Sequence, residues 1–220
     1  MSCGENSTNN LDRSLRSIVK PKVYPPDFVG YENLIAFMEE RSLHKLEGDI
    51  VEIGAFMGGG TVKLAEYARK HGKTVHVVDI FEPALDQTAS KSGMTACTVY
   101  EAYLEGRSMI EVYQEAIEEF DNIITLREDS KKIKFDDGKR FFFGFIDGCH
   151  EETYVTSDFH TIWPNLVSGG ALGFHDYEYD DWPEVTKAIR KLVEEHRGEI
   201  DEMIEVEGVY SIRSLIVVKK

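Results

Sequence analysis

The chain has few cysteines and no long apolar run. Three cysteines (Cys3, Cys97 and Cys149) are too few for a disulfide framework, so we expect a reducing, cytoplasmic setting. No apolar run approaches the roughly 18 residues that a membrane-spanning helix needs. Residues 1–10 are polar and lack the apolar core of a signal peptide. We therefore expect no membrane partner.

Basic residues are also scarce. The 25 lysines and arginines are outnumbered by 40 aspartates and glutamates, which gives a formal net charge of −15. Nucleic-acid phosphates normally bind to a basic face, so we expect no nucleic acid as substrate or partner. With 42% hydrophobic residues, 220 residues are enough for one α/β domain with a sizeable core. We expect an N-terminal tail over residues 1–25 and a single domain over residues 26–220.

The most informative segment spans residues 49–83. A β-branched run at residues 50–53 leads into a glycine-rich turn at Gly54, a helical pattern begins at Thr61, and a second apolar run reaches Asp79. A β-α-β unit with glycines at its first turn and an acid at the end of its second strand is typical of nucleoside binding. The glycines let the backbone approach the ligand, the helix N-terminus supplies N–H donors, and the acid can accept hydrogen bonds from ribose hydroxyls.

The spacing of the turn indicates which nucleoside binds. Glu52, Gly54, Gly58 and Gly60 read E-x-G-x-x-x-G-x-G, whereas the dinucleotide fingerprint reads G-x-G-x-x-G. A glycine-rich turn of an unrelated α/β protein remains the alternative explanation of this segment alone. The pattern resembles motif I of class I S-adenosylmethionine-dependent methyltransferases, whose turn cradles the methionine part of the cofactor. The resemblance implies S-adenosylmethionine as cofactor, with Asp79 at its ribose.

The same resemblance assigns further cofactor contacts. Asp129 would meet the adenine amino group; without the resemblance, Asp129 and Ser130 are a polar turn. The expected cofactor-binding residues are Glu52, Gly54, Ala55, Phe56, Gly58, Gly60, Thr61, Asp79, Ile80, Asp129, Ser130 and Asp147.

Apolar runs and amphipathic stretches alternate along the rest of the chain. Beyond the first β-α-β unit we expect helices at residues 31–46, 109–120, 151–163 and after Pro183, strands at 123–126, 141–146 and 171–174, and a closing hairpin of 203–206 with 215–218. Residues 84–106 have no clean period and predict a lid-like insertion. This is the element order of the Rossmann-like, seven-stranded, mostly parallel methyltransferase sheet with helices on both faces. The resemblance implies that its last strand is antiparallel.

Three stretches extend the resemblance. Residues 78–82 read V-D-I-F-E, residues 145–150 read F-I-D-G-C-H, and residues 168–177 read S-G-G-A-L-G-F-H-D-Y. They look like the D-S-F-E, I-D-G-D-H and L-x-P-G-G segments of the macrocin-O-methyltransferase-like branch. Ile80 replaces the serine, and Cys149 replaces an aspartate that is a proposed proton acceptor in that branch. The resemblance covers roughly residues 48–180 and implies O-methylation of a small-molecule acceptor.

Polar groups follow each of the five expected parallel strands. Ligands of open α/β sheets bind beyond the carboxyl ends of the strands, so these groups should lie together. They are Gly54 with its turn, Asp79, Asp129 with Ser130, residues 147–150, and His175 with Asp176.

His150 is the best candidate for a general base, with Asp147 beside it as a second catalytic residue. An imidazole with an ordinary pKa near 6.5 can accept a hydroxyl proton at neutral pH in a base-assisted SN2 transfer. A capping or packing role for His150 stays open. Five further histidines are expected at surface or core positions; they are His44, His71, His76, His160 and His196.

A divalent cation such as Mg²⁺ is implied by the resemblance, since several members of the branch bind one. Carried over by position, its ligands would be Asp147 and Asp176 with His175 or Tyr177. Hard cations prefer oxygen ligands, so a histidine suits magnesium less well. The acidic residues 176–181 are either a solvated loop or the rim of a site for a cationic or metal-bound substrate.

Two other functions stay open at this point. The replacement at Cys149 fits a non-catalytic S-adenosylmethionine-binding protein. A nicotinamide-dependent oxidoreductase is disfavoured by the glycine spacing and by the lack of a Tyr-x-x-x-Lys pair on a helix. The sequence leaves open a homo-oligomer and does not name the acceptor.

Overall fold

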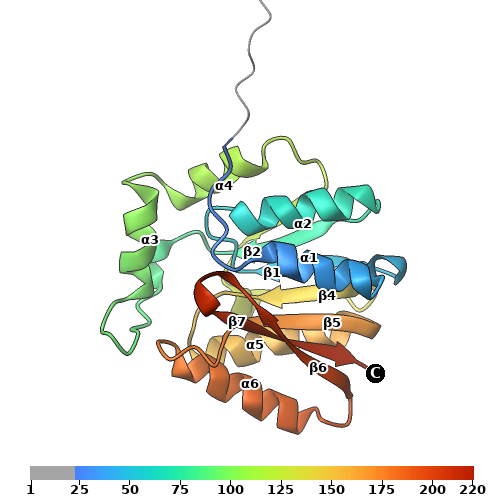
Figure 1. Cartoon of the computed structure of the whole chain (residues 1–220). Coiled ribbons are helices and arrows are strands. Elements are labelled where there is room, and N and C mark those ends of the chain that lie inside the picture. Colours follow the sequence, from blue (N-terminus) through green and yellow to red (C-terminus); the bar gives the residue numbers. More distant parts are fainter. Residues whose placement is uncertain (1–22) are drawn as a thin grey trace, which may run out of the picture.

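A single sheet collects the apolar runs. The computed structural model describes residues 23–220, so most of the expected tail over residues 1–25 lies outside the described residues. The strands are β1 (Asp49–Ile53), β2 (Val75–Asp79), β3 (Ile123–Arg127), β4 (Phe141–Ile146), β5 (Leu166–Tyr177), β6 (Ile200–Glu207) and β7 (Arg213–Lys219). Their order is β3-β2-β1-β4-β5-β7-β6 (Figure 1). Strands β1 to β5 pair in parallel, and β7 lies antiparallel between β5 and β6, as predicted.

Helices cover both faces of the sheet (Figure 1). On one side lie α1 (Tyr31–Glu40), α2 (Gly59–Lys70) and α4 (Met109–Ile117), and on the other lie α5 (Glu152–Ile162) and α6 (Pro183–Glu195). Side chains of a strand alternate between the faces, so Ile50 packs in the first layer while Val51 and Ile53 pack in the second. The expected fold class is therefore confirmed. None of the helices within residues 23–220 is long and apolar enough to cross a membrane.

The helices differ most from the sequence prediction in two segments. The helix expected over residues 31–46 ends at Glu40, because Ser42 adopts a left-handed conformation with φ of 54° and a separate 3₁₀ turn, η1 (Leu43–Lys45), follows. Residues 84–106, which showed no period, contain η2 (Pro83–Leu85) and the helix α3 (Ala96–Leu104). Thr95 caps α3 by accepting a hydrogen bond from the Thr98 N–H at 3.2 Å. The remaining 3₁₀ turns are η3 (Ser130–Lys132), η4 (Trp163–Asn165) and η5 (Val209–Ser211).

Strand β5 is longer than predicted and carries a bulge. The sequence placed its end before His175, but it continues to Tyr177. Its register against β7 shifts between Phe174 and Tyr177, and Asp176 there has a left-handed φ of 56°. Bulges bend a strand and redirect its side chains, and they are common beside active sites. His175 and Asp176 therefore belong to an irregular part of the strand and do not follow its end.

Candidate active site

The turn between β1 and α2 depends on Gly54. Its φ is +88°, and a Cβ there would lie 2.0 Å from the carbonyl oxygen of Asp147. Only glycine lets this turn lie against the end of β4. Gly60 serves packing of a different kind, because a Cβ there would lie 2.2 Å from the Tyr31 ring. Gly58, with φ of 86°, is the N-cap of α2.

Glu52 and Thr61 lie beneath the turn. Glu52 is fully buried and accepts hydrogen bonds from the Tyr31 hydroxyl at 2.6 Å and the Thr61 hydroxyl at 2.5 Å. Burial raises the pKa of Glu52 to about 8. The sequence did not predict that Glu52 and Thr61 would be buried beneath the turn. The two hydrogen bonds fasten α1 and α2 to β1, so Glu52 supports the turn from below.

Asp79 fastens the turn from the side. Its Oδ2 accepts hydrogen bonds from the backbone N–H groups of Ala55 at 2.8 Å and Phe56 at 3.1 Å, and its Oδ1 accepts one from Phe81 at 2.6 Å. Burial raises the pKa of Asp79, although these N–H groups oppose the shift. The carboxylate therefore holds the backbone of the turn in place, and Oδ1 keeps capacity for a further donor.

Two cavities meet at the carboxyl ends of the strands. The first has a volume of about 470 Å³ and is lined in part by Asp79, Ile80, Asp129 and Ser130. The second has a volume of about 360 Å³ and is lined in part by Phe28, Tyr103, His150, His175, Asp176 and Trp182. The residues common to both linings are Gly54, Phe56, Tyr100 and Asp147. The structure thus brings most of the predicted site residues to two adjoining cavities.

Two imidazoles and two carboxylates form a network between the ends of β4 and β5. His150 Nε2 lies 3.0 Å from Asp176 Oδ2. His175 Nδ1 lies 3.0 Å from Asp147 Oδ1 and 3.2 Å from Asp176 Oδ2. The His150 ring stacks on Trp182, with centroids 4.3 Å apart. His150 Nδ1 and His175 Nε2 are buried without a hydrogen-bond partner in the described structure.

The pKa shifts in this network favour ion pairs between the imidazoles and the carboxylates. Burial alone would lower the pKa of His150, but the hydrogen bond and charge of Asp176 raise it above its ordinary value. Burial opposes the charge of His175 too, yet Asp147 and Asp176 raise its pKa well above the ordinary range. The pKa of Asp176 is lowered despite burial, because both imidazoles face it. Asp176 therefore remains a carboxylate that can orient His150.

Cys149 does not have the environment of a nucleophile or base. Burial raises the pKa of its thiol, so the thiolate is disfavoured at neutral pH. Its Sγ lies 3.5 Å from the Thr88 hydroxyl, and Thr88 belongs to the 84–106 segment. The thiol contributes a wall of the first cavity.

The predicted metal ligands lie together, but they do not fit magnesium. Ligand atoms of Asp147, His175 and Asp176 all lie within 4.8 Å of one another, without Tyr177. Magnesium requires near-octahedral oxygen coordination. Here the His175 imidazole, whose pKa is raised well above the ordinary range, stands between the two carboxylates and supplies the positive charge that an ion would bring. We derive no step through a metal.

Comparison with known families settles the class of protein. Residues 51–177 match a family model described as a methyltransferase domain. The chain belongs to this methyltransferase family. It is an S-adenosylmethionine-dependent enzyme, and the resemblance to the macrocin-O-methyltransferase-like branch is confirmed. No curated protein matches the sequence of this methyltransferase.

Solved structures share the methyltransferase fold. The O-methyltransferase NovP is 17% identical with a TM-score of 0.64, covering 86% of this chain and 79% of its own. CalS11, a TDP-rhamnose 3′-O-methyltransferase, is 15% identical with a TM-score of 0.56, covering 84% of this chain and 77% of its own. TomG from Streptomyces achromogenes, solved with S-adenosylmethionine, is 15% identical with a TM-score of 0.54, covering 86% and 79%. At such identities the similarity supports the fold.

The sequence missed most of the aromatic lining of the methyltransferase's second cavity. Phe28 precedes α1, Tyr100 and Tyr103 lie on α3, and Trp182 precedes α6. Tyr100 and Tyr103 gave a weak signal, because aromatic residues stand out in an otherwise aperiodic segment. Phe28 and Trp182 gave none, since their place at the cavity follows from tertiary packing.

Proposed function

We propose that this methyltransferase transfers the methyl group of S-adenosylmethionine to a hydroxyl of a small-molecule acceptor. The observation that carries the proposal is the pair of adjoining cavities, with the turn and Asp79 at one and His150 with Asp176 at the other. The cofactor would occupy the first cavity, with its methionine part at Gly54, its ribose at Asp79 and its adenine at Asp129 and Ser130. The sulfonium would then lie near the junction of the cavities.

His150 is the proposed base for this reaction. Asp176 faces Nε2, so the tautomer with a proton on Nε2 leaves the Nδ1 lone pair free to accept the hydroxyl proton. The acceptor oxygen forms a bond to the methyl carbon as the carbon–sulfur bond breaks, giving S-adenosylhomocysteine and a methyl ether. Alignment of the reacting atoms can contribute roughly 7–11 kcal/mol. The proposal gives Asp147 a supporting role, because it faces His175 at the junction.

The lining of the second cavity favours an acceptor with an aromatic or apolar body and no negative charge. Within residues 23–220, neither cavity is lined by a lysine or arginine. Eight phenylalanine, tyrosine and tryptophan residues are among those that line the second cavity, and its carboxylates would repel an anion. The diphosphate of a TDP-sugar, the acceptor class named for CalS11, would find no lysine or arginine in this lining, and the His175 imidazole already pairs with Asp147 and Asp176. Neutral or cationic hydroxy compounds are therefore the acceptors to screen.

The segment at residues 84–106 is proposed to cover the reaction. It supplies Thr88 to the first cavity, Tyr103 to the second and Tyr100 to both. Lids of this kind exclude water and complete the site. The cytoplasmic setting and a homo-oligomer stay predictions.

Cofactor titration tests the first half of the proposal. Calorimetry should show micromolar-range binding of S-adenosylmethionine or S-adenosylhomocysteine and no binding of NAD. Asp79→Ala should weaken that binding by about 1.5–3 kcal/mol, the scale of hydrogen bonds to a charged group. Glu82→Ala is a matched control, because Glu82 lines the same cavity but pairs with Arg127 at 2.7 Å. If both variants weakened cofactor binding equally, Asp79 would not be a ribose ligand.

A screen of neutral and cationic hydroxy compounds, read by mass spectrometry of methylated product, tests the second half. Cofactor binding without transfer to any acceptor would favour the non-catalytic alternative. Tight NAD binding without either sulfur nucleoside would contradict the proposal as a whole.

Removal of divalent cations should leave methyl transfer intact. The imidazole of His175 already lies between the carboxylates of Asp147 and Asp176, so the reaction is expected to need no further positive charge there. Initial rates should be measured after exhaustive treatment with EDTA and after addition of Mg²⁺ or Mn²⁺. A loss of activity that one of these ions restores would show that a metal takes part.

A further inference from the structure

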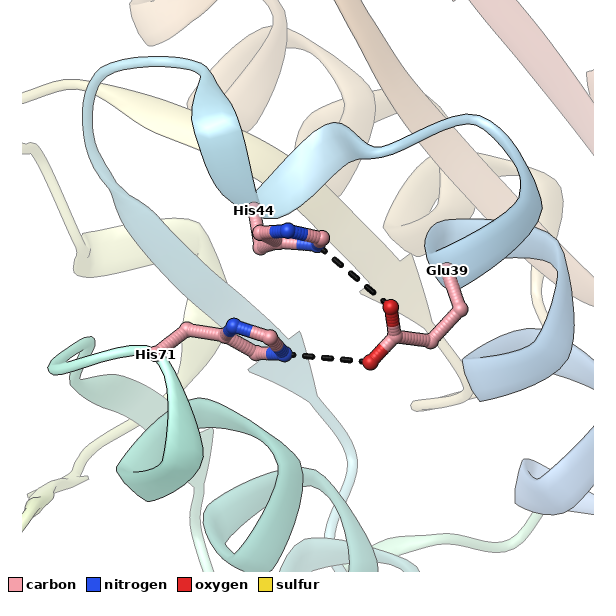
Figure 2. Close-up of side chains that lie close together, drawn as sticks. All are labelled: Glu39, His44 and His71. Atoms are coloured by element: carbon pink, nitrogen blue, oxygen red, sulfur yellow. Dashed lines mark hydrogen bonds and ion pairs between the residues drawn. The ribbon is translucent and has the colours of Figure 1, made fainter.

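A second group of metal-ligating side chains lies away from the cavities. Glu39 is in the last turn of α1, His44 is in η1, and His71 is the C-cap of α2. Helix α2 begins at the carboxyl end of β1 and runs back along the sheet, so its C-terminal end lies at the opposite edge from the cavities. The three side chains come from separate elements and converge on one point (Figure 2).

The carboxylate of Glu39 lies beside the two stacked imidazoles and faces a nitrogen of each (Figure 2). Its Oε1 is 3.1 Å from His71 Nε2, and its Oε2 is 3.6 Å from His44 Nδ1. The two rings stack with centroids 3.9 Å apart and an interplanar angle of 15°. One ligand atom from each residue lies within 4.8 Å of those of the other two. Two nitrogens and one oxygen thus lie close together, and rotation of the two rings out of their parallel stack would let all three coordinate one ion.

A single carboxylate faces both stacked rings. A metal ion coordinates a ring nitrogen through its lone pair, so zinc binding would release any proton that this nitrogen holds.

The helix ends around the cluster favour a cation. Helices α1 and α2 both terminate here, and the C-terminal ends of helices carry partial negative charge on their last carbonyl groups. Two basic side chains at these ends point elsewhere: Arg41 pairs with Glu202 at 2.6 Å, and Arg69 lies over the Phe120 ring. Two helix ends and one carboxylate thus surround the imidazoles.

Tyr67 holds the rings from beneath. Its hydroxyl lies 3.3 Å from His44 Nδ1, and its ring packs edge-on against His71 with centroids 4.8 Å apart. Burial raises the pKa of Tyr67 above its ordinary value, so its hydroxyl remains a donor and is not itself a ligand. An ion at His44 Nδ1 would replace this long hydrogen bond. The histidine side chains are 17% and 22% exposed, which leaves an approach for an ion and room for the rings to turn.

We propose that Glu39, His44 and His71 bind one divalent transition-metal ion of the Zn²⁺ class. Imidazole nitrogen suits zinc, copper and nickel better than magnesium or calcium, and three protein ligands with a water complete a tetrahedral zinc site. The ion would join α1, η1 and α2, and binding to the folded state alone would stabilise the protein. The sequence gave no hint of this site, because its ligands lie on separate elements. It is independent of the proposed function.

Zinc titration of the full chain tests the proposal. Metals are first removed with EDTA, and the EDTA is then removed by buffer exchange. Calorimetry with ZnCl₂ at neutral pH should show a micromolar-range site, and zinc should raise the midpoint temperature of thermal unfolding. His44→Ala and His71→Ala should each weaken this site at least tenfold. Glu39→Gln replaces an exposed carboxylate and should also weaken zinc binding. It provides the test if a histidine variant fails to fold. Co²⁺ should give visible absorption bands in the wild type that these variants lose.

Two controls separate this site from other zinc ligands. His160→Ala removes an exposed histidine of α5 and should leave the site unchanged. His175→Ala breaks the cluster at the cavities and should also leave it unchanged, so that failure of the methyl-transfer proposal would not affect this result. The proposal would be overturned by a wild-type protein that binds no zinc below millimolar concentration, or by His44 and His71 variants that bind it as tightly as the wild type.

Discussion

His150→Ala is expected to reduce methyl transfer by about 10²–10⁴-fold, the usual contribution of one general base. Cofactor affinity should stay nearly unchanged, because His150 lines the second cavity and not the first. His196→Ala is a matched control, since His196 also pairs with a carboxylate, Glu199 at 2.8 Å, but lies outside both cavities. Steady-state rates per folded molecule measure the effect.

The pH dependence provides a second readout for His150. A base must be neutral to accept a proton, and Asp176 raises the pKa of His150 above 6.5. Turnover should therefore rise with pH through an apparent pKa above that value. Asp176→Asn tests the pairing, because asparagine tolerates the left-handed conformation at this position. The substitution should move the rise in turnover to lower pH. A His150→Ala variant that melts earlier but turns over normally would indicate a bracing role.

Gly54→Ala is expected to destabilise the protein by at least about 3 kcal/mol, because it combines left-handed strain with a backbone clash. The new Cβ would lie 2.0 Å from the Asp147 carbonyl oxygen, and neither the turn nor β4 has room to move. Any folded fraction should also bind cofactor poorly, since the turn would be displaced from the first cavity. Urea denaturation and cofactor calorimetry measure the two effects.

Gly72→Ala is the control for Gly54→Ala. Gly72 also has a positive φ, +65°, but a Cβ there would meet nothing within 4 Å. It should show only the conformational cost, about 1–2 kcal/mol. If Gly54→Ala destabilised the protein no more than Gly72→Ala, the close contact between the turn and β4 would not be the reason that position 54 needs glycine.

The strands were predictable because their signals are local. The run at residues 141–146 is apolar throughout, as a strand buried on both faces must be, and β4 has these bounds. Helix α3 was not predictable in the same way. Its sequence includes the β-branched Thr98 and Val99, and of its nine residues only Ala96, Cys97 and Leu104 are buried. A helix with so little buried surface leaves no clear period in the sequence.

Most of the predicted site residues line the two cavities, but Glu52, Gly58 and Thr61 line neither, and the contacts were not predicted. Glu52 and Asp79 were identified from spacing, yet what each carboxylate touches depends on distant residues. Tyr31 of α1 covers Glu52, and the backbone of the turn surrounds Asp79. The bulge at Asp176 depends on pairing with β7, a strand much later in the chain. Tertiary contacts of this kind leave no trace in local sequence.

The antiparallel insertion of β7 has a consequence for how the protein is made. Strand β5 lies inside the sheet, but one of its two neighbours is formed by residues 213–219, which the ribosome adds only after α6 and β6. Until then the apolar β5 presents an unpaired edge, the kind of surface through which nascent chains associate wrongly. Closure of the sheet is therefore a late event in synthesis.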